Sequence, residues 1–284
     1  MVGATMDKIR PRPAPLATPF VRWPGSKRNL LPTLLGCAPR DYSRYVEPFL
    51  GSACLFFALA PPKAVLADNN ALLISAFEAV RDHPVMVSNY LAGREISPDA
   101  YYAARARLGR LRNPTQRSKT FLYLNRLCFN GVFRTNRSGH FNVPFGSRTG
   151  AMPSRRHLVA CSRALKPVRI EVSDFEDTLA RTGTGDFVYL DPPYFKPGRS
   201  TYGEYGYGCF SENDLGRLVK SIRSASCRGA RILLSYSNDP RVVRAFSNWD
   251  ITRVSAVRTV SADYLRRTSQ RDLLFANFVL PRVR

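Results

Sequence analysis

Short apolar runs alternate with amphipathic segments near both ends of the chain. An apolar run of about four to eight residues, bounded by turn residues, is typical of a strand buried in a sheet. Such runs predict strands at residues 45–47, 64–67, 168–172, 187–190 and 231–237, followed by an antiparallel pair at 251–257 and 273–279. The segments between them predict helices, among them residues 29–35, 53–59 and 212–225. Strands that alternate with helices in this way predict an α/β fold with a mainly parallel sheet.

This alternation stops in the middle of the chain. Residues 76–165 have long Arg-rich helical faces and no strand–helix–strand order. We therefore expect a sheet domain formed by residues 19–75 and 166–284, with residues 76–165 inserted as a second domain. Residues 1–18 contain Pro, Arg and Ala without periodicity, and we expect them to form a flexible tail.

The charge of the chain indicates a polyanionic partner. The 43 Lys and Arg residues outnumber the 21 Asp and Glu residues, which gives a net charge of +22 and a pI of about 10.4. Between Ala100 and Ile170 there are 15 basic residues and no acidic one. Solvated faces normally mix both signs, so a surface that binds phosphates explains this stretch better. Nucleic acid is the first candidate partner and a membrane surface the second, although a GC-rich genome would also raise the number of Arg residues.

Within the acid-free stretch, residues 134–142 predict a β-hairpin whose turn is centred on Ser138-Gly139. Arg, Asn and Thr side chains can read base edges, and a two-stranded ribbon fits the major groove of DNA. The alternative is a packed hairpin that is basic only on its exterior.

Composition excludes several other classes of protein. No apolar run is long enough to span a bilayer, and the N-terminus lacks the apolar core of a signal peptide. The six Cys residues are scattered, with no Cys-x-x-Cys pair, and there are only three His residues, so we expect no metal site. We therefore expect a reduced, cytoplasmic protein with no membrane partner.

Two strand ends near the N-terminus predict half of a nucleoside site. Gly51 lies in the turn after the first strand, where a missing side chain lets backbone approach a ligand. Asp68 ends the second strand, a position from which acids accept hydrogen bonds from ribose hydroxyls. The Gly-x-Gly-x-x-Gly fingerprint is absent, so these residues alone fit any nucleotide-binding α/β protein. Upstream, Trp23 and Lys27 flank a Gly-Ser turn, which indicates either a ligand contact or a solvent loop with one packed ring.

The tetrapeptide Asp191-Pro192-Pro193-Tyr194 directly follows the apolar run at 187–190. An acid at the carboxyl end of a buried strand lies where open α/β sheets bind their ligands. The two prolines fix a rigid turn, and Tyr194 supplies an aromatic surface beyond it. A carboxylate, fixed carbonyl groups and a stacking ring could together hold a planar amine. The alternative is an ordinary strand-ending turn in which Tyr194 only packs.

In this order, the motifs resemble those of the Dam-type, or class alpha, DNA adenine-N6 methyltransferases. That family transfers a methyl group from S-adenosyl-L-methionine (AdoMet) to the exocyclic amine of an adenine flipped out of the duplex. The motifs are Arg22-Trp23-Pro24-Gly25-Ser26-Lys27, Glu47-Pro48-Phe49-Leu50-Gly51-Ser52, Leu66-Ala67-Asp68-Asn69-Asn70, the segment 124–146 and the tetrapeptide at 191–194. The resemblance covers nearly the whole chain after residue 18. It implies a Rossmann-like methyltransferase sheet with an inserted domain of helices and a β-hairpin that recognises double-stranded DNA.

The resemblance also implies roles for single residues. The catalytic residues would be Asp191, Pro192, Pro193 and Tyr194. The residues in contact with AdoMet would be Trp23, Lys27, Glu47, Phe49, Gly51, Asp68, Asp174, Phe175 and Asp191. The residues in contact with DNA would be Asn130, Val132, Arg134, Asn136, Arg137, Asn142 and Arg148. Methyl transfer in this family requires no metal ion.

The sequence departs from the family pattern in two places. Gly25-Ser26 stands where the family usually has Gly-Gly before the Lys. After Phe145-Gly146 the chain has Ser147-Arg148, where the family often has Arg-Tyr. Because those positions help to read the target, the second difference argues against GATC as the recognised sequence.

Other substrates and functions stay open at this point. Methylation of a cytosine ring carbon would need a Cys nucleophile, usually after a Pro, and no Cys of this chain follows a Pro. Amino-methylation of cytosine or of RNA and a non-catalytic nucleic-acid-binding protein are the alternatives. A nucleotide-dependent oxidoreductase is disfavoured because the dinucleotide fingerprint is absent. We expect a monomer encoded by a bacterium or a phage, and a companion restriction enzyme would fit such a protein.

Overall fold

The computed structural model describes residues 17–136, 138–147, 149–195, 210–255 and 271–281. The predicted tail lies almost wholly outside this part of the chain, as do Arg137 and Arg148. Among the described residues, no helix is both long and apolar enough to cross a membrane.

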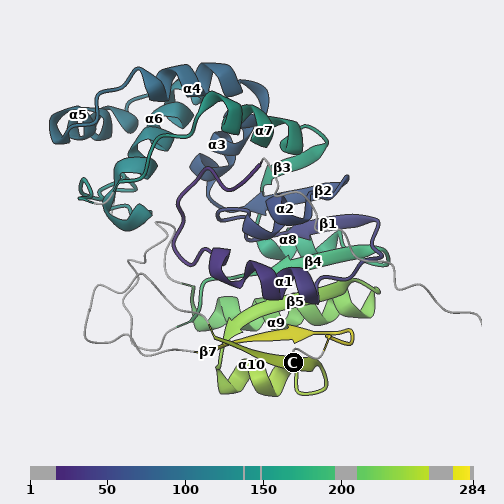
Figure 1. Cartoon of the computed structure of the whole chain (residues 1–284). Coiled ribbons are helices and arrows are strands. Elements are labelled where there is room, and N and C mark those ends of the chain that lie inside the picture. Colours follow the sequence, from purple (N-terminus) through teal and green to yellow (C-terminus); the bar gives the residue numbers. More distant parts are fainter. Residues whose placement is uncertain (1–16, 137, 148, 196–209, 256–270, 282–284) are drawn as a thin grey trace, which may run out of the picture.

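A seven-stranded sheet organises the molecule (Figure 1). Its strands are β1 (Arg44–Glu47), β2 (Ala64–Asp68), β3 (Val168–Val172), β4 (Asp186–Leu190), β5 (Arg231–Ser237), β6 (Asp250–Ser255) and β7 (Arg271–Ala276). Their order is β3-β2-β1-β4-β5-β7-β6, with β1 to β5 parallel and β7 antiparallel to both of its neighbours. The α/β class and the late antiparallel pair are confirmed, although β7 begins two residues earlier than predicted. The chain order turns back between β1 and β4, so the carboxyl ends of these two strands form a topological switch point.

Helices cover both faces of this sheet. The helices that pack on one face are α1 (Leu31–Cys37), α2 (Cys54–Leu59) and α3 (Ala71–Asp82). Those on the opposite face are α8 (Phe175–Ala180), α9 (Glu212–Cys227) and α10 (Pro240–Ala245). On β4, Phe187 and Tyr189 join the first core, whereas Val188 and Leu190 join the second. A strand buried on both faces has a continuous apolar sequence, which is why the run before Asp191 is so clear.

The first helix begins later than predicted. Residues 28–30 form only a 3₁₀ turn, η1 (Arg28–Leu30), and α1 starts at Leu31 with Pro32 in its first turn. Proline is tolerated there because its missing N–H would have no partner inside the helix. The predicted helix at 29–35 is therefore displaced towards the C-terminus by two residues at each end.

The middle of the chain is helical, as predicted. Its helices are α4 (Pro84–Ala92), α5 (Pro98–Leu108), α6 (Pro114–Leu127) and α7 (Arg155–Leu165). Ser97 and Asn113 cap α5 and α6 by accepting backbone N–H bonds, and a Pro follows each cap. In Figure 1 these helices lie above the β3 edge of the sheet. The boundary expected at residue 75 falls inside α3, and this helix packs both on the sheet and on α6 and α7.

The predicted hairpin is present between α6 and α7. Thr135 pairs with Phe141 in an antiparallel bridge. Gly139 has a φ of +75°, a left-handed conformation that glycine adopts without strain. The side-chain oxygen of Asn136 accepts two backbone N–H bonds across the turn, at 3.1 and 2.9 Å. The turn is therefore closed by its own residues.

Candidate active site

Three acids lie at the carboxyl edge of the parallel strands. Glu47 ends β1, Asp68 ends β2 and Asp191 follows β4. They are close enough that the charges of Asp68 and Asp191 both act on Glu47. Because β1 and β4 meet at the switch point, this edge is where a sheet of this topology binds its ligand. The acids favour a positively charged ligand there.

Asp191 is held in an ion pair with Lys27. The Lys27 ammonium lies 2.6 Å from a carboxylate oxygen, and the two side chains are only 10% and 20% exposed. Burial alone would lower the pKa of Lys27, but the Asp191 carboxylate beside it holds that pKa above its ordinary value. Lys27 is therefore charged at neutral pH. Pro192 is buried and Pro193 half-buried in the turn that follows.

The Tyr194 ring lies beside the same ion pair. The Lys27 nitrogen is 5.4 Å from the ring centroid. The ring also packs against Tyr236, with centroids 4.8 Å apart, and the Tyr194 hydroxyl donates to Asp272 at 3.2 Å. Burial raises the pKa of Tyr194, so the hydroxyl stays protonated and remains a donor. The structure thus brings the N-terminal motif and the tetrapeptide into direct contact.

Gly51 forms a turn against Asp68. The φ of Gly51 is +47°, and its N–H points to the Asp68 carboxylate at 3.3 Å. The backbone N–H of Asn70 donates to the same carboxylate at 2.9 Å. A Cβ on Gly51 would lie 3.1 Å from Trp23, whose ring closes over the turn. These contacts fix the Asp68 carboxylate beside a stretch of backbone that has no side chain of its own.

Burial makes two of these carboxyl groups weaker acids. It raises the pKa of Asp68 to about 6, although the two backbone N–H groups that donate to this carboxylate lower it. Burial also raises the pKa of Glu47, and the negative charges of Asp191 and Asp68 add to this effect. The Tyr45 hydroxyl donates to Glu47 at 2.9 Å. A cation bound beside these acids would favour their ionised forms.

Aromatic rings line the edge between β1 and α8. Phe49 and Phe175 stack with centroids 5.4 Å apart and planes at 25°, and Phe210 packs against both. Asp174 caps α8 and pairs with Arg217 at 2.8 Å. Phe49, Asp174 and Phe175, which were predicted to contact one ligand, therefore lie together on an apolar surface with an acid at its rim.

The hairpin residues predicted to contact DNA differ in their surroundings. Arg134 is exposed, and its guanidinium donates to the side chain of the half-buried Asn142 at 2.9 Å. Asn136 is exposed, but its side-chain oxygen is engaged in the turn. Asn130 is exposed with a φ of +51°, and Val132 is half-buried on the way into the hairpin. Arg134 is thus the described hairpin residue best placed to reach a base.

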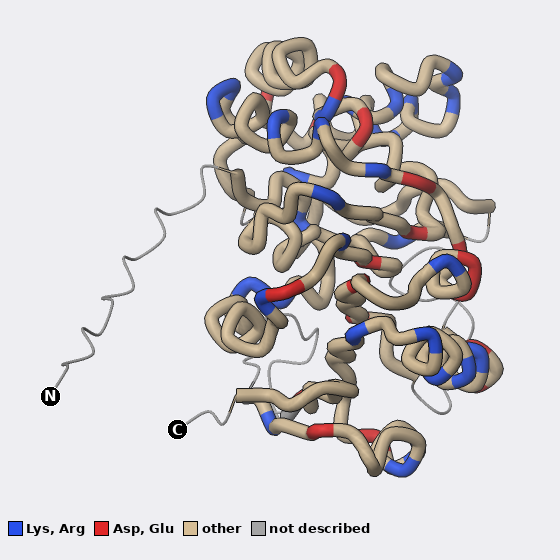
Figure 2. The backbone as a smooth tube through the Cα atoms, turned by 90° about the vertical axis from the view of Figure 1, so that its right-hand side faces the viewer, with Lys and Arg blue, Asp and Glu red and all other residues tan. Residues whose placement is uncertain are grey.

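Helix α5 lies beside this hairpin and belongs mostly to the stretch of the chain that has basic but no acidic residues. Arg105 of α5 donates to the Val143 carbonyl at 2.9 Å. A Cβ on Gly109, after α5, would lie 2.9 Å from His140 of the hairpin. Figure 2 shows Lys and Arg recurring along the helices, and within the described part of residues 100–165 none of them forms an ion pair.

The N-terminal motif contacts α6 and the segment that leads into the hairpin, and the sequence did not reveal these contacts. Trp23 stacks on Phe133, just before the hairpin, with centroids 5.3 Å apart and planes at 23°. The buried side chain of Asn125, on α6, bonds to the backbone N–H and C=O of Arg22 at 2.9 and 2.7 Å. An Asn among apolar residues of a helix is the only signal that pointed to such a contact. The segment that carries Trp23 and Lys27 is thereby fixed to the inserted part.

Comparison with known proteins decides the family. A family model described as D12 class N6 adenine-specific DNA methyltransferase matches residues 23–260. The chain belongs to this family. The Type II methyltransferase M1.LlaDCHI of Lactococcus lactis subsp. cremoris is 32% identical over 270 residues, which cover 92% of this chain and 95% of that protein. A DNA adenine methylase of Haemophilus influenzae is 30% identical over 270 residues, which cover 90% of this chain and 92% of that protein.

The methyltransferase therefore acts on the N6 amine of adenine in DNA, as the resemblance implied. Its Rossmann-like sheet with helices on both faces is confirmed. The matched region contains every described residue predicted for the site, from Trp23 to Tyr194. Methyl transfer by this family implies AdoMet as the donor.

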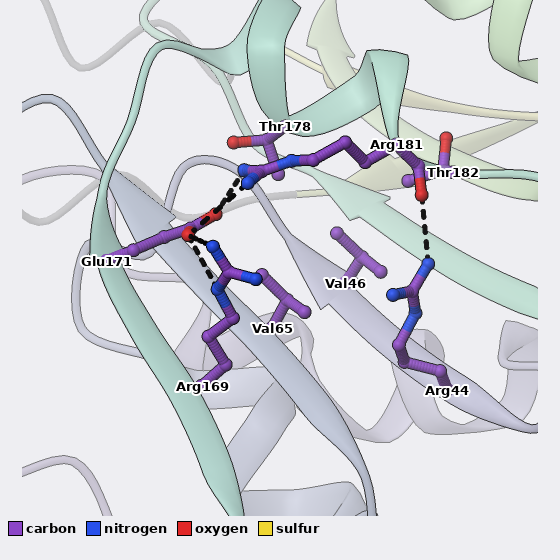
Figure 3. Close-up of a pocket in the computed structure, with 8 residues that line it drawn as sticks. All are labelled: Arg44, Val46, Val65, Arg169, Glu171, Thr178, Arg181 and Thr182. Carbon is purple, nitrogen blue, oxygen red and sulfur yellow. Dashed lines mark hydrogen bonds and ion pairs between the residues drawn. The ribbon is translucent and has the colours of Figure 1, made fainter.

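A small cavity beside β1, β2, β3 and α8 is separate from this site (Figure 3). Its volume is about 40 Å³, which suits a water molecule or two but not AdoMet. Within it, Glu171 accepts hydrogen bonds from Arg169 and Arg181, and Arg44 donates to the Arg181 carbonyl at 3.0 Å. No residue predicted for the methyltransferase site lines this cavity.

Proposed function

We propose that Asp191, Pro192 and Tyr194 hold an adenine flipped out of double-stranded DNA, while the turn after β1 and the end of β2 hold AdoMet. The observation that supports this most directly is the Lys27–Asp191 ion pair beside the Tyr194 ring. It lies at the switch point of the sheet and joins the two motifs that would meet the reacting groups.

The turn after β1 and the end of β2 fit AdoMet. When bound, AdoMet supplies a methyl group on a positively charged sulfonium. Asp68 is fixed by two backbone N–H bonds at the position from which an acid accepts ribose hydroxyls. Gly51 keeps the turn free of a side chain, and Trp23 closes over it. Glu47 and Asp191 add negative charge that favours a cation.

Further groups complete this fit. Phe49 and Phe175 would bind the adenine ring of AdoMet through their apolar faces, with Asp174 at the rim. The Tyr189 hydroxyl is buried near Asp191 and, among the described residues, has no hydrogen-bond partner. A buried donor without a partner is expected where a ligand completes the site.

Asp191 and the Pro192 carbonyl would act on the target amine. The N6 lone pair of adenine is delocalised into the ring, which makes the amine a poor nucleophile. Accepting both N–H bonds favours a lone pair directed at the methyl group and keeps the two reacting atoms in line. The carboxylate also stabilises the positive charge that develops on the amine. Lys27 would hold Asp191 in place and contact AdoMet from the N-terminal turn.

Tyr194 would stabilise the flipped base. Extruding a base from the duplex costs a few kcal/mol of stacking and pairing energy. Stacking on an aromatic ring returns about 1–3 kcal/mol. Pro193 restricts the backbone of the turn from which the ring projects, so that little backbone freedom is lost on binding.

The hairpin would read the recognition sequence. Arg134, exposed and oriented by Asn142, has the side chain best suited to a bidentate contact with guanine. The other residues that we propose to contact DNA are Asn130, Val132, Asn136, Arg137 and Arg148. Because Ser147-Arg148 replaces Arg-Tyr, we propose a target other than GATC.

We propose that the enzyme acts as a monomer in the cytoplasm of a bacterial or phage-infected cell. Direct transfer from a sulfonium uses no metal ion, because the positive charge of the donor already activates the methyl group. A single chain carries both the reading hairpin and the catalytic edge. A companion restriction enzyme would fit, since one relative is a Type II methyltransferase.

Asp191→Asn tests this proposal without changing the size of the side chain. We expect methyl transfer to duplex DNA to fall by about 10³-fold or more, because the group that stabilises the developing charge is lost. DNA binding should stay within about twofold of the original. Asp41→Asn, which changes an exposed acid paired with Arg231, is the matched control and should leave transfer unchanged. Transfer by Asp191→Asn within tenfold of the original enzyme would contradict the proposal, as would a product other than N6-methyladenine.

A further inference from the structure

The antiparallel strand β7 brings an additional acid to the carboxyl edge of the parallel strands, beside Asp191 and Tyr194. Because β7 runs against β5, its first residues, and not its last, lie beside the carboxyl ends of the parallel strands. Asp272 is the second residue of β7 and pairs with Ser237, the last residue of β5. The carboxylate therefore lies at the same edge of the sheet as Asp191 and Tyr194.

Asp272 is buried to a degree that is unusual for an acid. Only 1% of the residue is exposed. Removing a carboxylate from water is unfavourable unless hydrogen bonds or opposite charges compensate for it. The Tyr194 hydroxyl donates to its Oδ2 atom at 3.2 Å. This hydrogen bond links Asp272 to the tetrapeptide.

Tyr194 is consequently held at two points. Its hydroxyl is fixed by Asp272 on β7, and its ring packs on Tyr236 of β5 with planes at 49°. The next residue is tied to the same place, because the Phe195 backbone N–H donates to the Tyr236 hydroxyl at 3.0 Å. A ring anchored by its face and by its tip has a fixed plane. The plane of Tyr194 is what a flipped base would have to match.

We propose that Asp272 is a positioning residue for methyl transfer, which sets the plane and the electron density of the Tyr194 ring against the flipped adenine. This inference rests on the proposed role of Tyr194 as the stacking surface. The Asp272 carboxylate would touch neither the base nor the methyl group. It would act through the Tyr194 phenol, which would lie between this carboxylate and the base.

The effect should be larger in the transition state than in the bound complex. A phenol that donates to a carboxylate gains electron density, which makes the face of its ring more negative. The adenine becomes positively charged as the methyl group is transferred, and a cation is attracted to the face of an electron-rich ring. An interaction that strengthens as charge develops raises the rate of the chemical step more than it raises substrate affinity.

A double-mutant cycle tests this inference. The variants are Asp272→Asn, Tyr194→Phe and the two together, measured by single-turnover methyl transfer to duplex DNA. Each single variant should slow transfer by about tenfold to 100-fold, because Tyr194→Phe removes the donor and Asp272→Asn removes the charge of the acceptor. The double variant should be no more than about twofold slower than the slower single variant, because both changes act on the same charge-assisted hydrogen bond. Rates that fall multiplicatively, or an Asp272→Asn enzyme with the original rate, would overturn the inference.

A second readout separates positioning from general stability. With 2-aminopurine in place of the target adenine, stacking on Tyr194 quenches the fluorescence of the flipped base. Asp272→Asn should increase that fluorescence while AdoMet affinity stays within about twofold of the original. Unchanged fluorescence together with a slower rate would contradict a role in setting the plane of the ring.

Two controls make the result specific. The matched site is Asp186, a buried acid at the amino end of β4 that pairs with Arg44. Asp186→Asn should lower the melting temperature without slowing transfer. The Asp191→Asn enzyme tests the underlying function independently. If it is inactive while Asp272→Asn transfers at the original rate, only the role of Asp272 is refuted. If Asp191→Asn is active, the proposed function itself fails.

Discussion

The affinity for AdoMet should depend on pH through Asp68. Burial raises the pKa of this acid to about 6, above its ordinary value. In the proposed AdoMet site, the ionised carboxylate would accept the ribose hydroxyls, whereas the protonated form would have lost an acceptor. Affinity should therefore be complete at pH 8 and should fall as the pH drops through 6. This direction follows because lowering the pH populates the form that binds the ribose poorly.

The size of the effect follows from the same pKa. If only the ionised form binds, the apparent Kd rises by a factor of one plus the ratio of protonated to ionised Asp68. For a pKa of about 6, that factor is about two at pH 6 and about eleven at pH 5, or about 1.4 kcal/mol. Calorimetric titration with AdoMet from pH 5 to pH 8 at constant ionic strength measures it directly. Circular dichroism at each pH verifies that the protein stays folded.

Asp68→Asn identifies the group that is responsible. The amide cannot titrate, so this variant should bind AdoMet more weakly at pH 8 and show no change between pH 8 and pH 5. Asp41→Asn, at an exposed acid far from the strand ends, should keep the full pH dependence. A variant Asp68→Asn that retains the elevenfold change would refute the assignment, since the titrating group would then lie elsewhere, with Glu47 the first candidate.

Further predictions concern the Gly51 turn, Arg134 of the hairpin and the hydrogen bond from Tyr101 to Val143. Gly51→Ala adds a Cβ 3.1 Å from Trp23 at a φ of +47°, so AdoMet affinity should fall by about tenfold, and an unchanged Kd would argue against this turn as the binding site. Arg134→Ala should reduce discrimination between the target and a one-base variant by about 1–3 kcal/mol in kcat/KM, whereas an equal loss on both duplexes would indicate a phosphate contact instead. Tyr101→Phe removes a buried hydroxyl that donates to the Val143 carbonyl at 2.9 Å, and calorimetric unfolding should show a loss of about 1 kcal/mol with transfer retained.

Strand ends could be predicted from the sequence because burial on both faces leaves a distinct pattern. β4 is buried along its whole length, so its apolar run shows that the strand ends directly before Asp191. The same reasoning places Asp68 at the end of β2. Parallel strands direct their carboxyl ends to one edge, and a sequence that alternates strands and helices therefore already implies that these acids meet.

Contacts between distant segments could not be predicted in the same way. The last strand was expected to begin at residue 273, which left Asp272 in a loop. Its place at the catalytic edge follows only from the reversed direction of β7. The stacking of Trp23 on Phe133 likewise depends on where the inserted part folds back, which local sequence does not encode.

Asn136 illustrates a residue type that suits two tasks. Asn reads base edges, but it also closes turns by accepting backbone N–H bonds from residues ahead of it. In the structure its side-chain oxygen closes the turn, and its amide N–H groups remain the part that could reach DNA. The sequence alone favours neither task, because both place an Asn near the tip of a hairpin.

The proposed function is tested most directly by mapping methylated bases in a living cell. The enzyme and its Asp191→Asn variant would be expressed separately in a bacterial host whose own DNA lacks adenine methylation, and the genome of each culture would be sequenced for modified bases. We expect N6-methyladenine at one short, recurring sequence with the original enzyme and none with Asp191→Asn. Equal methylation by both enzymes, or methylation of cytosine in place of adenine, would contradict the proposed function.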